Sequence, residues 1–138
     1  MVKQGQSRAN LKTRRRHMLQ TSEAPIYNDH ELDFSKVREF LGLQLNLLAK
    51  LIGVSPSTLK NKKVSAETRM RATSVVKIVH HLWELSHDEN KARRWLNEPK
   101  DRLLGLTPVE FMQINPKKNV PIIEQDLRKQ RFGEAMGA

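Results

Sequence analysis

The chain has no cysteine among its 138 residues, and aromatic residues make up only 5% of it. Without thiols it can form neither a disulfide framework nor a thiolate metal site. No apolar run approaches the ~18 residues that a membrane-spanning helix needs, and no hydrophobic signal segment opens the sequence. We therefore expect a cytoplasmic protein that does not act in a membrane.

Signatures of catalysis are missing as well. The sequence holds no glycine-rich phosphate loop and no nucleophile–base pair that residue spacing can nominate. His80, His81 and His87 lie near one another in the chain, but with no cysteine available they do not predict a metal site. We expect no enzymatic activity, no metal and no cofactor.

The charge is strongly positive and unevenly distributed. The formal net charge is +10, from 25 Lys+Arg against 15 Asp+Glu. Residues 1–20 contain six basic residues, among them Arg14, and no acidic one, while residues 41–77 contain a single acid, Glu67. Such clustering favours a polyanionic partner, above all nucleic acid, over a generally basic surface.

The segment 44–63, QLNLLAKLIGVSPSTLKNKK, is typical of a helix-turn-helix. Ala49 is small enough to let a second helix cross closely. Gly53 stands where the chain must turn sharply, with a positive φ that a side chain would penalise. Ser55 is a natural N-cap, and Pro56 follows at the first helical position, where its missing N–H costs nothing.

The second helix of this pair has one apolar anchor, Leu59, and is otherwise polar and basic. A helix that buries so little is suited to the major groove of DNA. We predict that these residues bind DNA: Ser57, Thr58, Lys60, Asn61, Lys62 and Lys63. An ordinary helical hairpin on a globular surface is the alternative. Leu45 and Leu47, which occupy positions that are polar in many such pairs, would cover a neighbouring element or an oligomer contact.

The remaining pattern predicts further helices and no strands. A first helix starts at Asp33 or Ser35, and Ser65 caps one long helix with an apolar stripe, Ala72, Val75, Val76, Val79, Leu82 and Trp83. Ser86 with Glu89, and Thr107 with Glu110, have the spacing of capping boxes. A last helix would start near Val120–Pro121, with Gly133 as its stop.

We therefore predict an all-α protein, with a helix-turn-helix domain followed by a small helical domain. Residues 1–33 would form a basic flexible arm, either inert or touching DNA. Residues 34–85 would hold the helix-turn-helix and the long helix, and residues 86–138 the second helical domain and a tail.

The second half resembles a known family. The runs KARRWLNEP and GLTPVEFM are similar to the C-terminal domain of the Xre/MbcA/ParS antitoxin family, whose members often carry an Xre-like helix-turn-helix before it. The residues that carry the likeness are Ala92, Arg93, Arg94, Trp95, Leu96, Asn97, Pro99, Gly105, Thr107 and Pro108. The resemblance covers roughly 41–132. The linker 100–106 and Pro121 depart from the pattern.

The resemblance implies a type II antitoxin that binds and inhibits a RES-domain toxin, an ADP-ribosyltransferase-like enzyme that uses NAD, and represses its own operon by binding operator DNA. It places these residues at the toxin: Arg94, Arg128, Arg131, Phe132 and Met136. Helix-turn-helix repressors usually act as dimers on paired half-sites, so we expect a homodimer. A stand-alone repressor without a toxin partner is the alternative function.

Overall fold

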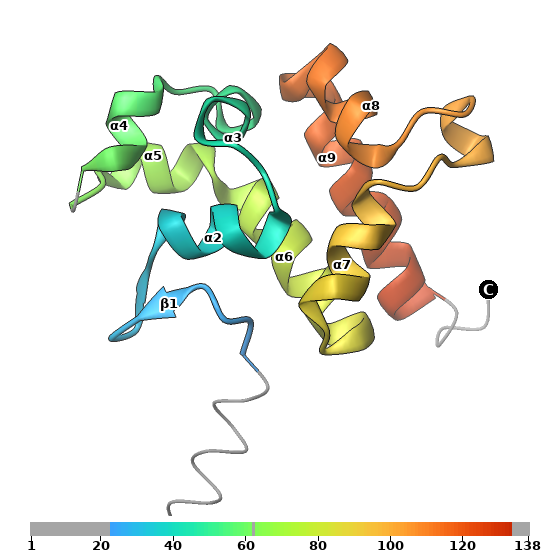
Figure 1. Cartoon of the computed structure of the whole chain (residues 1–138), viewed down its shortest axis with the longest axis horizontal. Coiled ribbons are helices and arrows are strands. Elements are labelled where there is room, and N and C mark those ends of the chain that lie inside the picture. The colour runs from blue at the N-terminus through green and yellow to red at the C-terminus, as the bar shows by residue number, and fades with distance from the viewer. Residues whose placement is uncertain (1–22, 62, 134–138) are drawn as a thin grey trace, which may run out of the picture.

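The computed structural model of the chain describes residues 23–61 and 63–133. Within these ranges eight α-helices follow a small antiparallel hairpin of β1 (Tyr27–Asn28) and β2 (Glu31–Leu32) (Figure 1). The helices are α2 (Phe34–Leu41), α3 (Leu45–Ile52), α4 (Pro56–Lys60), α5 (Ala66–Arg71), α6 (Thr73–Ser86), α7 (Glu89–Leu96), α8 (Pro108–Ile114) and α9 (Pro116–Arg128). A 3-10 turn, η1 (Asp101–Leu103), precedes α8, and a π-helical turn, η2 (Lys129–Gly133), follows α9. The predicted helical class is confirmed, and the hairpin was not predicted.

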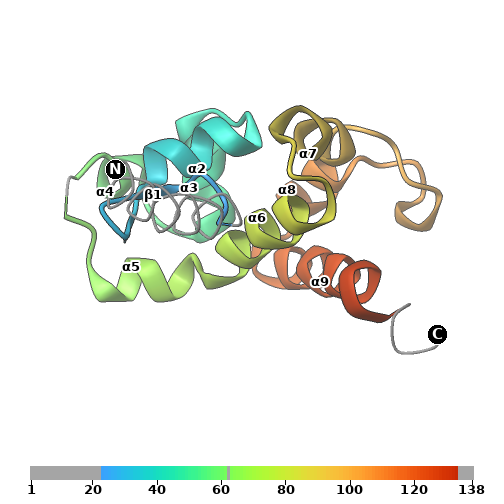
Figure 2. The same cartoon turned by 90° about the horizontal axis from the view of Figure 1, so that it is seen from below.

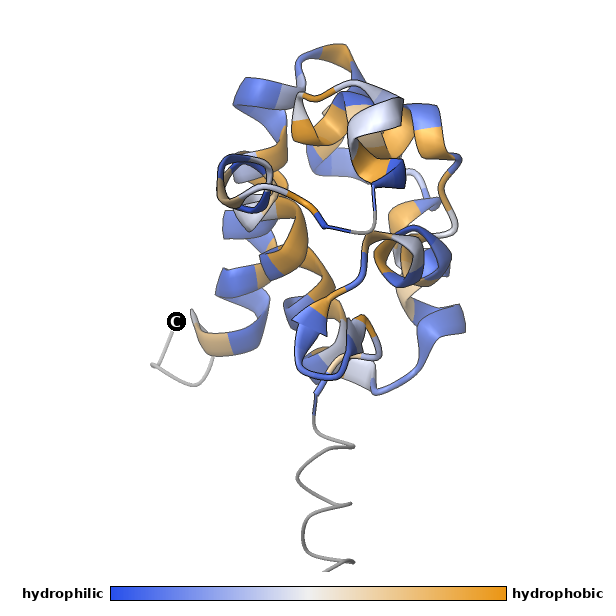
Figure 3. Ribbon diagram, turned by 90° about the vertical axis from the view of Figure 1, so that its left-hand side faces the viewer, coloured by the Kyte–Doolittle hydropathy of each residue, from blue (hydrophilic) through white to orange (hydrophobic). Residues whose placement is uncertain are grey.

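Helix α6 runs through the middle of the molecule, between a group formed by the hairpin and α2–α5 and a group formed by α7–α9 (Figure 2). It packs against α2, α7 and, most extensively, α9. Helix α3 also contacts α8 and α9. The buried apolar residues of both groups form one hydrophobic cluster, and Figure 3 shows where apolar residues lie along the ribbon. Residues 34–85 and 86–133 therefore share a core.

Residues 23–33 differ from the flexible arm that the sequence predicted. Ile26 is fully buried and Ala24 nearly so, and both belong to the hydrophobic cluster. The Asp33 N–H donates to the Ile26 carbonyl at 2.9 Å, which closes the hairpin onto the start of α2. The Tyr27 hydroxyl lies 2.7 Å from His80 Nε2 on α6. The remainder of the predicted arm, residues 1–22, lies outside the described residues.

The predicted long helix is two helices. Ser65 caps α5 as predicted, since its hydroxyl accepts from the Thr68 N–H at 3.1 Å. The chain then bends at Ala72, whose ψ of −3° departs from helical geometry. The Thr73 hydroxyl donates to the Arg69 carbonyl one turn earlier, at 3.4 Å. A side-chain bond of this kind competes with the backbone ladder and bends helices.

Two predicted helix starts are also wrong. Ser86 is the last residue of α6, and the N-cap of α7 is Asp88, whose carboxylate accepts from two backbone N–H groups of the first turn. Helix α9 begins at Pro116 after the N-cap Asn115, so Pro121 lies inside it. Both prolines can fill a first helical position, and the side chain of Asn115, which accepts from the Lys118 N–H, decides in favour of the earlier one.

The capping box of α8 is confirmed, and a second cap links the two groups of helices. The Thr107 hydroxyl and the Glu110 carboxylate accept from each other's backbone N–H, at 3.0 and 2.8 Å.

At the end of α2, Arg93 of α7 donates to the carbonyls of Glu39 and Phe40 at 3.0 and 3.2 Å. The Arg93 Cδ lies only 2.7 Å from where a Cβ on Gly42 would stand.

The segment 100–106 forms a closed loop around η1. Lys100 exchanges backbone hydrogen bonds with Gly105 and Leu106 at 3.0 Å each, and Arg102 pairs with Asp126 of α9 at 2.7 Å. At its tip Leu104 adopts a φ of +59°, a left-handed conformation that costs a residue with a side chain about 1–2 kcal/mol. Its side chain is 94% exposed. The loop is thus well braced and yet strained at one residue.

The burial of Ile26 yields a stability prediction. Replacing Ile26 by Ala should lower the free energy of unfolding by about 2–4 kcal/mol, because it leaves a cavity in the core. Denaturant unfolding measures the loss. The matched control is Ile114→Ala, since Ile114 is 67% exposed and its truncation should change stability by less than about 0.5 kcal/mol. Equal effects for the two variants would contradict the packing of residues 23–33 against the body.

Candidate functional site

The predicted helix-turn-helix is formed by α3, a tight turn and α4. Gly53 has the expected left-handed conformation, with a φ of +90°, and its N–H donates to the Ala49 carbonyl at 2.8 Å. The Val54 N–H donates to the same carbonyl at 3.0 Å. Pro56 occupies the first position of α4, and Leu59 is buried beneath it. The predicted left-handed Gly53 and the predicted place of Pro56 at the start of the helix are therefore confirmed.

Helix α4 is shorter than predicted. It ends at Lys60, and Asn61 is already extended, with a ψ of 138°. The physical reason lies in the sequence, because no apolar residue one turn after Leu59 continues the buried side of the helix. Lys63 therefore follows the helix rather than lying on it, and Lys62 lies outside the described residues.

The predicted DNA-binding side chains gather around this short helix. Ser57, Lys60, Asn61 and Lys63 are exposed, whereas Thr58 is half-buried. Ser55 does not cap the backbone as predicted; its hydroxyl contacts the hydroxyls of Ser57 and Thr58 at 3.2 and 2.8 Å. Each hydroxyl can both donate and accept, so these contacts leave capacity for a further hydrogen bond.

Cations surround the turn. Lys50, Lys60, Lys63 and Arg69 are exposed, and none of them pairs with a carboxylate in the described part of the chain. Arg71 pairs with Glu67 at 3.3 Å. The surface beside α4 thus offers several unpaired positive charges, which is the chemistry that a phosphate backbone requires.

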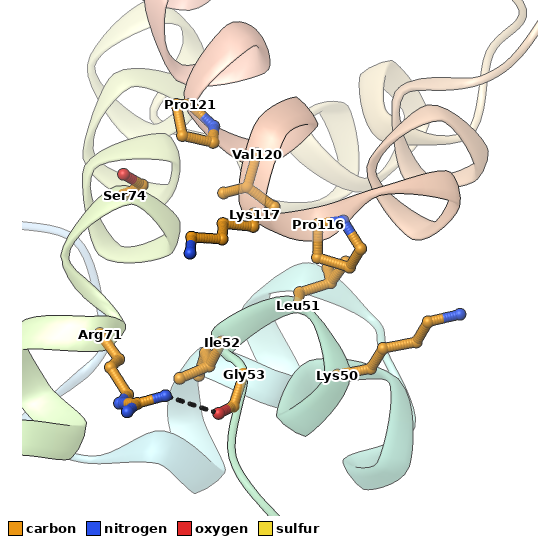
Figure 4. Close-up of a pocket in the computed structure, with 10 residues that line it drawn as sticks. All are labelled: Lys50, Leu51, Ile52, Gly53, Arg71, Ser74, Pro116, Lys117, Val120 and Pro121. Atoms are coloured by element: carbon orange, nitrogen blue, oxygen red, sulfur yellow. Dashed lines mark hydrogen bonds between the residues drawn. The ribbon is translucent and has the colours of Figure 1, made fainter.

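A basic hollow of about 540 Å³ adjoins the turn, between α3, the α5–α6 bend and the first turns of α9. Arg71 donates to the Gly53 carbonyl at 3.2 Å, and Lys117 of α9 points toward the same space (Figure 4). Leu51, Ile52 and Val120 are among its apolar lining residues. The guanidinium of Arg71 satisfies a carbonyl that α3 leaves free at its C-terminus, so this residue braces the turn.

The apolar stripe of α6 and the two unusual leucines of α3 serve the interior of the single chain. Ala72, Val75, Val79 and Leu82 are buried, while Val76 and Trp83 are partly buried against the core. Leu45 and Leu47 also pack against the core, and their helix contacts α8 and α9. Of the two possibilities that the sequence left for these leucines, cover of a neighbouring element is the one observed.

Arg128, one of the predicted toxin-binding residues, contacts a buried carboxylate. Glu124 of α9 is 5% exposed. His81 Nε2 lies 2.8 Å from Glu124 Oε2, and Arg128 donates to both carboxylate oxygens, at 2.8 Å to Oε1 and 3.0 Å to Oε2. The predicted Glu124–Arg128 pair is therefore present, and it engages one of the predicted toxin-binding arginines, whose side chain stays 49% exposed.

Of the other predicted toxin-binding residues, Arg131 and Phe132 contact His81 within this chain, and Arg94 is exposed to solvent. Arg131 Nη1 lies 3.3 Å from His81 Nδ1, and its guanidinium stacks over the Phe132 ring at 4.6 Å. Phe132 is 43% exposed and packs edge-on against His81. Arg94 of α7 is exposed. Met136 lies outside the described residues.

The pKa values of Glu124, His80 and Tyr27 are shifted from those of free side chains. Burial alone would raise the pKa of Glu124, but hydrogen bonds from His81 and Arg128 and the charge of Arg128 outweigh it and lower the pKa. Burial lowers the pKa of His80, and the nearby charges of Arg131 and His81 lower it further. Burial raises the pKa of Tyr27, with a contribution from Glu23. These shifts accompany the contacts that His80 and His81 of α6 make with Tyr27 and Glu124.

Comparison with known proteins finds no family model that matches the chain and no curated protein of significantly similar sequence. Within residues 23–61 and 63–133, no group of three or more His, Asp or Glu residues could hold a metal ion. In the same ranges no helix combines the length and apolar character of a membrane span.

Sequence reasoning missed several residues that position the site. Arg93 was grouped with the motif of the second half, and nothing in its local sequence indicates that it caps α2. The contact of His81 with Glu124 joins residues 43 positions apart, and no local pattern identifies such a pair. A weak signal existed for Ile26, an apolar residue in an otherwise polar stretch.

The lowered pKa of Glu124 predicts a loss of stability in acid. A carboxylate whose pKa is lower when folded stabilises the fold above its unfolded pKa, near 4.5, and this contribution is lost as the pH falls through the folded value. Glu124→Gln should reduce stability by about 1–3 kcal/mol at pH 7 and flatten its decline as the pH falls below the unfolded pKa of the carboxyl. Thermal unfolding across pH measures this. The exposed Glu31→Gln is the control, and an unchanged acid profile in Glu124→Gln would refute the role of the carboxylate.

Proposed function

We propose that the chain is a DNA-binding antitoxin that represses its own operon and inhibits a cognate RES-domain toxin, and that it is not itself an enzyme. The observation that carries the DNA-binding part is the Gly53 turn, which presents a short polar helix among unpaired cations. The toxin part rests on the motif resemblance of residues 92–108.

The DNA-binding proposal assigns different roles to the residues around α4. A helix entering the major groove presents its first turns to base edges, which favours Ser57 and Thr58, with Asn61 at the end of the helix. Lys60, Lys62 and Lys63 are suited to phosphates, since a flexible ammonium acts there as a point charge. Arg71 holds the turn and is a positioning residue.

The toxin-binding proposal places the contact on α7 and the end of the chain. Arg94 is exposed, and Phe132, with Arg131 stacked upon it, offers a partly exposed aromatic beside a cation. Exposed aromatic and arginine side chains are frequent centres of protein interfaces. Arg128 would contribute chiefly by orienting this end of the chain, because Glu124 occupies its guanidinium.

A homodimer is part of the proposal, because one short recognition helix reads too few base pairs for high specificity. The second candidate function is a stand-alone repressor, and the paired state of Arg128 and Arg131 within this chain favours it. Two observations together would favour the antitoxin over the stand-alone repressor. The neighbouring gene would encode a RES-like protein, and that protein would co-purify with this chain.

For DNA binding we predict separable effects on base preference and on overall affinity. Asn61→Ala should reduce discrimination at one base pair by ~1–3 kcal/mol. Lys60→Ala should weaken binding to every sequence and lower the salt dependence by about one unit of slope. Fluorescence anisotropy with operator and random duplexes at several salt concentrations measures both. An equal loss on operator and random DNA for Asn61→Ala would rule out its reading role.

For toxin inhibition we predict that a chain ending at Lys129 loses most of its inhibitory effect and keeps its operator affinity. It lacks Arg131, Phe132 and Met136, and a buried aromatic at an interface can contribute ~2 kcal/mol or more. Growth rescue during toxin expression is compared with operator binding, and Arg94→Ala tests the α7 contact separately.

Two results would oppose this prediction about the end of the chain. Rescue as complete as with the full chain would show that the helices inhibit without it. Loss of a cooperative thermal transition would show instead that Phe132 and Arg131 are needed for the protein's own core, where both contact His81.

A further inference from the structure

Leu104 combines two unfavourable properties. Its φ of +59° is a conformation that non-glycine residues rarely adopt. Its side chain is also 94% exposed, more than any other large hydrophobic side chain in the described ranges. Neither property helps this chain to fold, because a polar residue such as Asn would suit both better. Residues held in this way are concentrated at functional sites.

The loop that carries Leu104 is held in place from both sides. Backbone bonds from Lys100 to Gly105 and Leu106 close its base, and the Leu104 N–H donates to the Asp101 carbonyl at 2.9 Å. The Arg102–Asp126 pair ties the loop to α9. The side chain therefore projects from a braced support, and an interface would lose little conformational entropy in fixing it.

A hollow of about 210 Å³ lies directly beside this projection, between the loop and α9. Leu103, Ile122 and Ile123 supply its apolar lining, and Ile122 is 40% exposed. The exposed Leu104 therefore neighbours a hollow with an apolar floor and a polar rim that includes the Arg102–Asp126 pair and Lys129. This is the arrangement that a two-fold interface requires, because the same patch must be complementary to itself.

The charges around the two features also match. Asp101 is exposed at the base of the projection, and Lys129 is exposed at the rim of the hollow. Neither forms an ion pair within residues 23–61 and 63–133. When the projection of one copy enters the hollow of another, the acid of the first approaches the cation of the second. This charge complementarity favours a second copy of this chain as the occupant.

We propose that two copies of this chain associate through this patch, with Leu104 of each seated beside Ile122 of the other. The inference deepens the homodimer of the proposed function and rests on it. The leucines of α3 for which the sequence offered an oligomer contact, Leu45 and Leu47, pack partly against the core of the single chain, so the dimer does not depend on them.

The test uses the full-length chain, with sedimentation equilibrium from about 1 to 100 μM. Leu104→Asn should raise the dimer dissociation constant at least tenfold, because it removes the apolar projection. At concentrations where both chains are monomeric, it should also melt at a higher temperature than wild type, because Asn tolerates the left-handed conformation. The control is Ile114→Asn, which also replaces an exposed apolar side chain by Asn but lies outside the patch. It should leave the dimer intact.

A charge exchange tests the pairing itself. Asp101→Lys and Lys129→Glu should each weaken the dimer, and the double variant should restore it. A wild-type dimer that Leu104→Asn weakens no more than Ile114→Asn would overturn this surface alone. A wild-type chain that stays monomeric at all concentrations, with and without operator DNA, would overturn both this inference and the dimer in the proposed function. Retained operator binding in that case would leave the DNA-binding part standing.

Discussion

The contact of α6 with α9 is the constraint on which the rest of the structure depends. At its centre a buried carboxylate, Glu124, must find partners, since an unpaired buried charge is very costly. His81 and Arg128 are these partners. Because His81 lies on α6 and Glu124 on α9, their contact requires one particular alignment of the two helices. The position of α9 then fixes where α3 can rest, because α3 contacts α9 directly.

The helix-turn-helix is consequently not an autonomous module in this protein. Its first helix uses apolar side chains, Leu45 and Leu47, where a self-contained unit would expose polar ones, and these leucines pack against the core that the second half completes. The basic hollow beside Gly53 likewise includes Lys117 of α9. A partner that displaced α9 would therefore disturb the presentation of α4, which gives a physical route for coupling between the two proposed activities.

Local chemistry predicted those features that depend on neighbouring residues in the chain. The left-handed Gly53, the Ser65 cap and the Thr107–Glu110 box were all predictable, because each is satisfied within one turn. The end of α4, the bend at Ala72 and the start of α9 required a choice between competing local signals. The burial of Ile26 and the cap supplied by Arg93 depend on tertiary contacts, for which a single sequence contains no local signal.

The close contact of Arg93 with Gly42 restricts which substitutions these two positions can accept. A side chain at position 42 would meet the arginine stem at 2.7 Å and would be strained in a backbone whose φ is +67°. Shortening Arg93 first would remove the clash but take away the side-chain donor of the Glu39 and Phe40 carbonyls, of which Glu39 would keep the Gly42 N–H. Either order of substitution passes through a weakened intermediate. The effect of a substitution at Gly42 or Arg93 should therefore depend on which residue stands at the other position.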